Sequence, residues 1–209
     1  MRRSSWRPVR AALALVVGLS APVCDAATIV RSADLGELVA EAGSAILADV
    51  VAVRYGRDER GLHGTWVTVR VADPIFGDGL PAAGGEYTFK SYGAPVTMPD
   101  GSRVYIDGSP SYRPGDSLLL LLLPRSRWGF SGTAGLSQGV FRVRVDARGE
   151  RTAVGMAGNA GVFGERGLAG WLDPAARSGV PAAPDAPVPY AALRRAIADL
   201  ARTAGKVAR

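Results

Sequence analysis

Hydrophobic and polar residues alternate along much of the chain with a period of two, which is typical of half-buried strands. In residues 65–76, valines at 67, 69 and 71 face one way, whereas Trp66, Thr68 and Arg70 face the other. Residues 140–145 alternate in the same way, and the pattern predicts Phe141, Val143 and Val145 inward with Arg142 and Arg144 outward. Further strands are predicted at 45–53, 86–92 and 151–157.

Residues 118–123 are six consecutive leucines that follow a Pro114-Gly115 turn signal. This run is too short to cross a bilayer, which takes about 20 apolar residues. It is also too uniform for a strand with one wet face. We therefore expect a central strand that is covered on both faces.

A helix is predicted at each end of this series of strands. Asp34 and Glu37 have the capping-box spacing, directly before an apolar periodic segment. Near the end of the chain, residues 189–209 place Leu193, Ile197 and Leu200 on one face and arginines on the other. We expect this stripe to pack on the strands, and membrane association through the basic face is the less favoured alternative.

Together these elements predict a mainly β protein. The expected fold is a small OB-like β-barrel, closed or partly open, with a short N-terminal helix and a C-terminal amphipathic helix. Residues 27–173 form the barrel domain in this interpretation. A stiff Pro/Ala-rich linker at 174–188 then leads to the C-terminal helix.

The first 26 residues have the pattern of a secretory signal peptide. Four arginines precede the apolar run 11–19, and small residues predict cleavage between Ala26 and Ala27. A lipoprotein signal ending at Cys24 is a minor alternative, because Val23 replaces the usual small residue. We expect a secreted or periplasmic protein, without a disulfide because cleavage removes the single cysteine.

Charge is unevenly distributed along the chain. The formal net charge is +6, of which residues 1–26 contribute +3 and residues 174–209 contribute +4, leaving about −1 for residues 27–173. A nucleic-acid-binding domain should carry its basic footprint on the fold itself. A nucleic-acid partner is therefore not expected.

Residues 135–139 read Gly-Leu-Ser-Gln-Gly, which fits the G-x-S-x-G pattern of a serine nucleophile. That pattern requires a strand before the serine and a helix after it, whereas a loop precedes Ser137 and a predicted strand follows it. The single histidine, His63, lies far upstream in a polar turn. With 27 glycines in the chain, a chance match is favoured, and a serine hydrolase is kept as an alternative.

No residue set predicts a metal or cofactor site. His63 is expected to be a solvated turn histidine, and zinc sites need several ligands. Asp100 and Asp107 precede glycines and fit hairpin turns better than calcium ligation, and Asp73 and Asp78 lack the spacing of a calcium loop. No catalytic residue is assigned. The candidate partner-binding residues are Trp128 and Phe130 in a loop, with Arg142 and Arg144 on a hairpin.

The order of segments resembles a group of secreted bacterial proteins of unknown function, often encoded near matrixin-like zinc proteases. The matching blocks are "ADVVAV", "TWVTVRVADPIFGDG", "YRPGDSLLLLL" and "GLSQGVFRV", within residues 35–145. The succession is also similar to the OB-barrel of the netrin-like fold, which includes the tissue inhibitors of metalloproteinases. In those inhibitors an N-terminal cysteine chelates the protease zinc, but here cleavage would leave Ala27 or Thr28.

The expected function is therefore that of an exported, non-catalytic protein-binding module. Its partner is expected to be a secreted or envelope protein. The resemblance adds a second hypothesis, a regulator or inhibitor of a secreted matrixin-like zinc protease.

Overall fold

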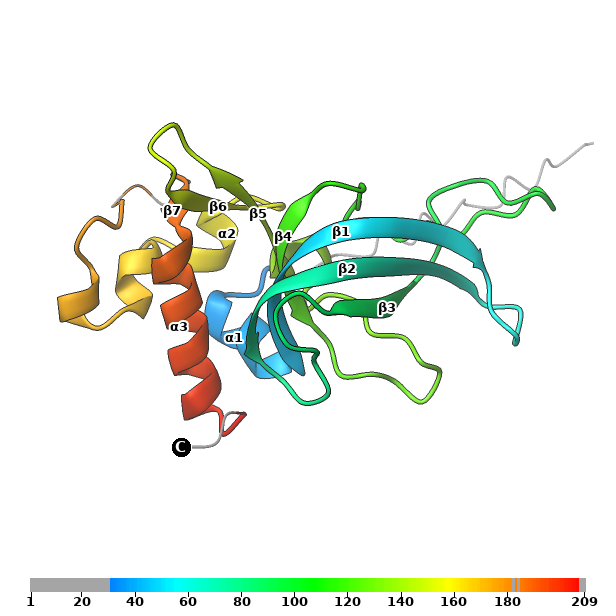
Figure 1. Cartoon of the computed structure of the whole chain (residues 1–209), viewed down its shortest axis with the longest axis horizontal. Coiled ribbons are helices and arrows are strands. Elements are labelled where there is room, and N and C mark those ends of the chain that lie inside the picture. Colours follow the sequence, from blue (N-terminus) through cyan, green and yellow to red (C-terminus); the bar gives the residue numbers. More distant parts are fainter. Residues whose placement is uncertain (1–30, 182, 184, 207–209) are drawn as a thin grey trace, which may run out of the picture.

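The computed structural model describes residues 31–181, 183 and 185–206, so the predicted signal peptide and its cleavage site at Ala26–Ala27 lie outside the described residues. This part of the chain contains seven strands and three α-helices (Figure 1). The strands are β1 (Ser44–Arg57), β2 (His63–Phe76), β3 (Glu86–Tyr92), β4 (Ser117–Leu122), β5 (Val140–Val145), β6 (Arg151–Gly155) and β7 (Val188–Pro189). The α-helices are α1 (Leu35–Glu41), α2 (Ala160–Phe163) and α3 (Tyr190–Thr203), and short 3₁₀ helices are η1 (Leu136–Gly139), η2 (Leu168–Trp171) and η3 (Pro174–Ala176).

All seven strands belong to one antiparallel sheet, in the order β3-β2-β1-β4-β5-β6-β7. The protein is therefore mainly β, as the alternation predicted. The sheet is open, because β3 and β7 are its two edges. Figure 1 shows the helices gathered at one end of the molecule and the far ends of β1 and β2 extending away from them.

The leucine strand β4 lies in the middle of the sheet and is buried on both faces, as predicted. Leu118 to Leu122 have no exposed surface. Leu119 and Leu121 contact the core beneath the helices, which we call the helix-covered core. Leu118, Leu120 and Leu122 contact a second core inside the curve of the sheet, the inner core, together with Ile46, Ala48, Val50, Val67, Val69, Val71, Phe89, Tyr112 and Val140.

The strands β1 and β2 bend strongly because their pairing is interrupted three times. The register shifts between Ala45 and Ile46, between Leu47 and Ala48, and between Val50 and Ala52. Each such bulge bends a strand and increases its twist. The first half of β1 is buried, whereas most residues from Val51 onward are at least partly exposed. The far half of this hairpin therefore projects beyond the helix-covered core.

The alternation in β5 was predicted correctly for four of its residues and wrongly for Val145. Phe141 and Val143 are buried, and Arg142 and Arg144 point outward. Val145, however, is 65% exposed. It pairs with Arg151 at the tip of the β5–β6 hairpin, where the strand has run past the core that buries Phe141.

Helix α1 begins at the predicted cap. The Asp34 carboxylate accepts the Glu37 amide at 2.9 Å, and the Glu37 carboxylate accepts the Asp34 amide at 3.1 Å. At the other end of α1, the Lys206 ammonium donates to the carbonyls of Ala40 and Ala42. This cation satisfies carbonyls that the helix leaves unpaired and complements its dipole.

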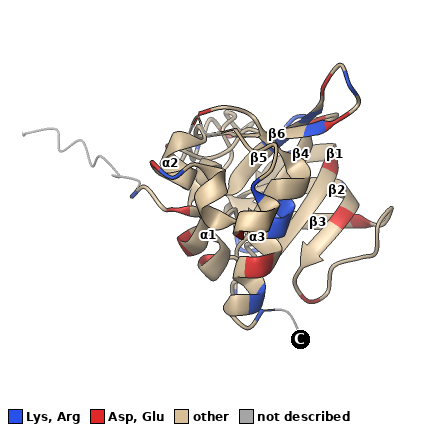
Figure 2. Ribbon diagram, turned by 90° about the vertical axis from the view of Figure 1, so that its left-hand side faces the viewer, with Lys and Arg blue, Asp and Glu red and all other residues tan. Residues whose placement is uncertain are grey.

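Helix α3 packs its apolar stripe into the helix-covered core, as expected. Leu193, Ala196, Ile197 and Ala201 are fully buried. Figure 2 shows α3 beside α1 over one face of the sheet. None of the helices in the described part of the chain is long and apolar enough to span a membrane.

One polar cluster joins α3 to β2. Arg194 donates to the Asp73 carboxylate at 2.6 and 3.1 Å, and the Tyr190 hydroxyl donates to it at 2.7 Å. Burial raises the pKa of Asp73, but the hydrogen bonds from Arg194 and Tyr190 outweigh this and leave the pKa below its usual value. Burial and the neighbouring Asp73 raise the pKa of Tyr190.

Asp73→Asn should lower the free energy of unfolding at pH 7 by about 1–2 kcal/mol, because a charged hydrogen-bond acceptor at a partly buried site is lost. The pKa of Asp73 is lowered in the folded state, so its stabilisation is complete above the ordinary carboxyl pKa of about 4 and is lost as the pH falls below it. The difference between wild type and variant should therefore shrink below about pH 4. Urea unfolding at pH 7, 4 and 3 measures this, with exposed Asp78→Asn as the matched control.

A constant difference between wild type and Asp73→Asn from pH 7 to pH 3 would contradict this role of the carboxylate.

Candidate functional site

The loop that carries Trp128 and Phe130 lies against the far ends of the three strands β1, β2 and β3. Side chains from these elements form one continuous patch, which we call the aromatic–cationic surface. Its members are Arg54, Arg60, Trp66, Lys90, Tyr92, Arg127, Trp128 and Phe130. Two of the four sequence-predicted binding residues, Trp128 and Phe130, are therefore brought together here.

Cations stack over the aromatic rings of this surface. The Arg54 guanidinium lies 4.0 Å from the centroid of the Trp66 ring, and the Lys90 ammonium lies 3.9 Å from that of Phe130. The side chains of Arg60 and Arg127 lie 5.2 and 5.1 Å from the Trp128 ring. Such contacts hold long basic side chains in place. Arg54, Arg60 and Arg127 are exposed, so their charges stay accessible.

The strands fix the middle of the surface by their register. Arg54 pairs with Trp66, and Trp66 pairs with Lys90, so the three side chains form one row across β1, β2 and β3. Tyr92 is two residues beyond Lys90 on the same face, and its ring meets Phe130 edge-on at 5.3 Å. A row on paired strands is more rigid than a loop.

Lys90 is anchored by an ion pair that is mostly covered. Its ammonium lies 2.6 Å from Asp58, and the two side chains are 11% and 10% exposed. Asp58 also accepts the amides of Arg60 and Leu62, at 2.9 Å each, and so shapes the β1–β2 turn. The hydrogen bond from Lys90 lowers the pKa of Asp58, which therefore remains a carboxylate.

The accessible charge of the surface is positive. Lys90 is neutralised by Asp58, but Arg54, Arg60 and Arg127 make no ion pair within the described residues. Trp128 is 44% exposed between Arg60 and Arg127. The surface thus presents unpaired guanidinium groups beside a large accessible ring.

The other two predicted binding residues lie elsewhere. Arg142 and Arg144 are on β5, where they line a shallow polar depression with Arg113 and Asp116. None of the described residues that line this depression is aromatic. The structure therefore separates the two predicted pairs and places only Trp128 and Phe130 in a mixed aromatic and basic setting.

The Gly-Leu-Ser-Gln-Gly segment is explained by packing. A Cβ at Gly139 would lie 2.3 Å from the Ala134 carbonyl oxygen, and one at Gly135, where φ is +56°, would lie 2.6 Å from Leu38. The Gln138 side chain accepts the Ala33 amide at 2.8 Å and donates to the Arg31 carbonyl at 3.1 Å. The segment therefore ties the chain before α1 to the sheet.

Ser137 itself lies in η1, which strand β5 follows directly, so the expected mismatch with a nucleophile elbow is confirmed. Its amide donates to the Gly108 carbonyl at 3.0 Å. The single histidine of the chain contacts a different serine, because His63 Nε2 lies 3.3 Å from Ser102 Oγ.

The prediction of a solvated His63 is wrong, since the residue is only 7% exposed. The loop after β3 folds over it and contributes Ser102, which in turn donates to Asp100. Arg57 also binds both residues, at 2.7 Å to Asp100 and 3.1 Å to Ser102. The Asp100 carboxylate thus contacts the serine and not the imidazole, so the order of contacts differs from that of a catalytic triad.

The aspartates weighed as calcium ligands have other partners. The Asp100 carboxylate accepts the Ser102 amide, and the Asp107 carboxylate accepts the Gly108 amide, both at 3.0 Å. Gly101 and Gly108 have positive φ. These features confirm the predicted turns. Asp73 binds Arg194. Among the described residues no group of three or more histidine, cysteine or acidic side chains is placed to hold a metal ion.

Sequence reasoning missed Arg54, Arg60, Trp66 and Lys90. One signal was present, because the alternation in β2 placed Trp66 on the outward face, where a large aromatic ring is unusual for a solvated strand. The contacts of Trp128 with Arg60 and of Phe130 with Lys90 join distant segments and have no local signature.

Gly139→Ala should lower the free energy of unfolding by about 2 kcal/mol or more, because the new methyl group meets a backbone carbonyl that cannot move freely. Gly132→Ala is the matched control from the same loop, since its nearest neighbour would be the Ser91 hydroxyl at 3.6 Å. Thermal and urea unfolding of both variants check this. Equal stability of the two would show that the glycine at 139 is dispensable.

Comparison of the chain with protein-family models, curated proteins and solved structures gives no match. The function is accordingly inferred from the chemistry of the described residues. Among these, the aromatic–cationic surface combines accessible rings, unpaired guanidinium groups and a rigid base.

Proposed function

We propose that the protein is an exported, non-catalytic module that binds an acidic surface of another secreted or envelope protein. The contact is made by the aromatic–cationic surface. The observation that carries the proposal is Trp128, nearly half exposed between Arg60 and Arg127, which have no ion-pair partners in the described part of the chain.

Tryptophan, tyrosine and arginine are the residues that contribute most binding energy at protein interfaces. Here they lie on or beside paired strands, with Trp66 and Lys90 held by stacking and by the ion pair to Asp58. Little side-chain freedom remains to be lost on binding, which favours affinity. The unpaired arginines favour a partner of opposite charge and speed its approach.

The proposal extends to the fold. We infer an OB-like barrel arrangement that includes the segment 131–134 as an additional, irregular wall. The Ala134 amide donates to the Leu121 carbonyl of β4, and the Leu123 amide donates to the Gly132 carbonyl of this segment, both at 2.8 Å. The Ser131 amide donates to the Lys90 carbonyl of β3, also at 2.8 Å. Through these hydrogen bonds the segment 131–134 connects β4 to β3. This connection supports the resemblance to the netrin-like fold.

That resemblance makes a secreted zinc protease one partner to be tested. The chain offers no cysteine at its predicted mature N-terminus, so regulation of such a protease would use the aromatic–cationic surface. The partner chemistry remains the same, an acidic protein surface with room for an aromatic ring.

The test is capture of partners by the tagged chain from residue 27 onward in its own cells, with cross-linking and mass spectrometry. Arg60→Glu and Trp128→Ala should each lower the yield of the main partner at least about tenfold, because a central contact of 2 kcal/mol or more is removed. Arg144→Glu, on β5, is the matched charge reversal and should leave the yield unchanged. Captured yield should also fall as salt rises.

Equal capture by wild type, Arg60→Glu and Trp128→Ala would refute the proposed surface. A loss confined to Arg144→Glu would transfer the interface to the β5–β6 hairpin. A zinc protease as the main partner would call for inhibition assays with the same three variants.

A further inference from the structure

The two predicted binding residues that lie outside the aromatic–cationic surface border a hollow of their own. Arg142 and Arg144 of β5 line it together with Arg113, Asp116 and Ser117, which belong to the turn before β4 and to its first residue. We call this space of about 380 Å³ the β5 depression. Alternate residues of a strand share a face, so the two arginines of β5 lie on one side, about 7 Å apart along the strand. Three guanidinium groups from two segments therefore border the same space.

The backbone on both sides of the β5 depression is fixed by hydrogen bonds. In the turn, the Asp116 amide donates to the Arg113 carbonyl, and the Asp116 carboxylate accepts the Arg113 amide, both at 3.0 Å. The turn is joined to β1, because the Gly115 amide donates to the Val50 carbonyl at 2.9 Å and the Val50 amide donates to the Asp116 carbonyl at 2.8 Å. The opposite side is strand β5, which pairs with both β4 and β6. The arginines thus extend from rigid positions.

The three arginines of the β5 depression lack the partners that many other arginines of this protein have. Arg57, Arg70 and Arg194 each pair with a carboxylate. None of the three in the depression forms an ion pair or stacks on a ring among the described residues. Asp116 is the one acid among the described residues of the lining, so three positive charges against one negative leave a net charge of +2. An anion would remove this repulsion between like charges.

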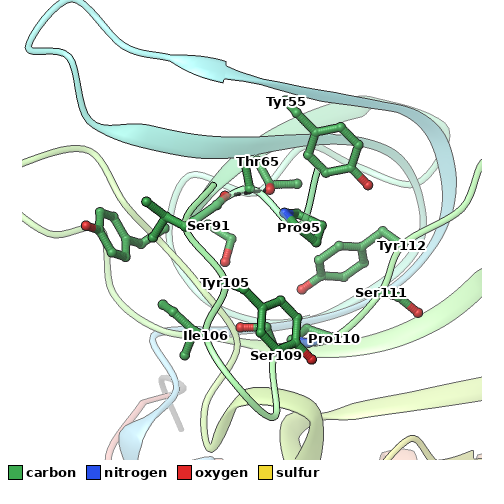
Figure 3. Close-up of a pocket in the computed structure, with 14 residues that line it drawn as sticks. Tyr55, Thr65, Ser91, Pro95, Tyr105, Ile106, Ser109, Pro110, Ser111 and Tyr112 are labelled. Atoms are coloured by element: carbon green, nitrogen blue, oxygen red, sulfur yellow. Dashed lines mark hydrogen bonds between the residues drawn. The ribbon is translucent and has the colours of Figure 1, made fainter. Parts of the chain in front are cut away.

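The other well-defined hollow of the sheet has the opposite chemistry. It lies beneath the loop 93–112, and Tyr55, Pro95 and Tyr105 are part of its wall (Figure 3). None of the described residues that line it is charged. A charged ligand would be costly to bury there without an ionic partner. Of these two hollows, only the β5 depression suits an anion.

The geometry of the donors indicates which anion fits. The planar fork of arginine matches the paired oxygens of phosphate, sulfate or carboxylate groups. Here the forks approach from two sides, from β5 and from the turn, and the Ser117 hydroxyl adds an uncharged donor. A tetrahedral group presents oxygens in several directions, whereas the two oxygens of a carboxylate lie in one plane. The net charge of the lining also matches a group with two negative charges.

We propose that the β5 depression binds a phosphate or sulfate group through Arg113, Arg142 and Arg144. Each guanidinium donates to oxygens of the group, and the bound charge replaces the carboxylate partners that these side chains lack. The inference does not rest on the protein-binding function, because none of its residues belongs to the aromatic–cationic surface. The shared chemistry has two sources, a free ion and the headgroup of a phospholipid.

The first experiment titrates inorganic phosphate and sulfate into the ¹⁵N-labelled chain from residue 27 onward, at about pH 7.5 and at an ionic strength held constant with sodium chloride. The Gly115 and Ser117 amides should shift in a saturable way, and that of Gly79, in the loop after β2, should not. The titration extends to about 20 mM, well above the Kd of about 1 mM expected for so small a ligand. Acetate, which is planar and singly charged, should bind about tenfold more weakly.

Arg113→Gln and Arg144→Gln each remove one guanidinium from the depression. Both side chains are exposed, so both variants should fold and unfold thermally as the wild type does. Each should weaken phosphate binding about tenfold or more, the loss expected for one charge-assisted hydrogen bond. Arg148→Gln is the matched control, because it removes a charge from the turn of the same hairpin without touching the lining. It should leave the affinity within about twofold of wild type.

Sedimentation with phosphatidylcholine vesicles that contain about 20% phosphatidic acid distinguishes the two sources. Sedimentation of the wild type that Arg144→Gln abolishes and Arg148→Gln does not would support the site and assign it to a lipid headgroup. Binding of the free ion without sedimentation would support the site and assign it to a small soluble ligand.

Three results would overturn the proposal. The first is the absence of a saturable shift at Gly115 and Ser117 with either ion. The second is equal affinity of wild type, Arg113→Gln and Arg144→Gln for phosphate. The third is acetate binding as tight as that of phosphate, which would remove the selection for a tetrahedral, doubly charged group. None of these results bears on Arg60→Glu or Trp128→Ala, so failure here is distinguishable from failure of the protein-binding surface.

Discussion

The burial of β4 on both faces is the constraint on which the rest of the structure depends. Five adjacent leucines without exposed surface require apolar partners above and below the sheet. A flat sheet alone cannot supply these partners. Helices α1 and α3 therefore cover one face, and the bent strands β1 and β2 curve around the other. Alternate leucines of the run face the helix-covered core and the inner core. A polar residue anywhere in the run would therefore be buried in an apolar core.

This arrangement divides the molecule into two halves with different demands. Near the helices, the contacts serve cohesion, as with Asp73 and Arg194 or Lys206 and the end of α1. Toward the far ends of β1, β2 and β3 none of the described helices covers the sheet (Figure 1), so both faces become available. One face gains the cation-stacked rings, and the other gains the cavity below the loop 93–112. The position of the aromatic–cationic surface thus follows from where the helices stop.

The sequence predicted much of this fold because its signals are local. The capping box of Asp34, the alternation in β2 and the leucine run each depend on neighbours within a few residues. The errors arose where distant contacts decide the outcome. Val145 lies beyond the edge of the core although its period is right, and His63 is covered by a loop that lies some 40 residues later in the chain. The glycine-rich stretch before β7 gave little periodicity, yet Phe163 stacks on Phe141 at 6.0 Å in the helix-covered core.

Residue type alone cannot identify a site in this chain, and the two buried tyrosines demonstrate why. Tyr112 and Tyr190 are each 6% exposed, and burial raises the pKa of each hydroxyl. For Tyr190 the sheet places a carboxylate opposite the hydroxyl, so the group is satisfied within the protein. For Tyr112 the ring lies in the inner core against Phe89, and the neighbouring Thr133 side chain opposes the rise in its pKa. What the fold places at the end of each hydroxyl therefore decides its role, and only the three-dimensional arrangement specifies it.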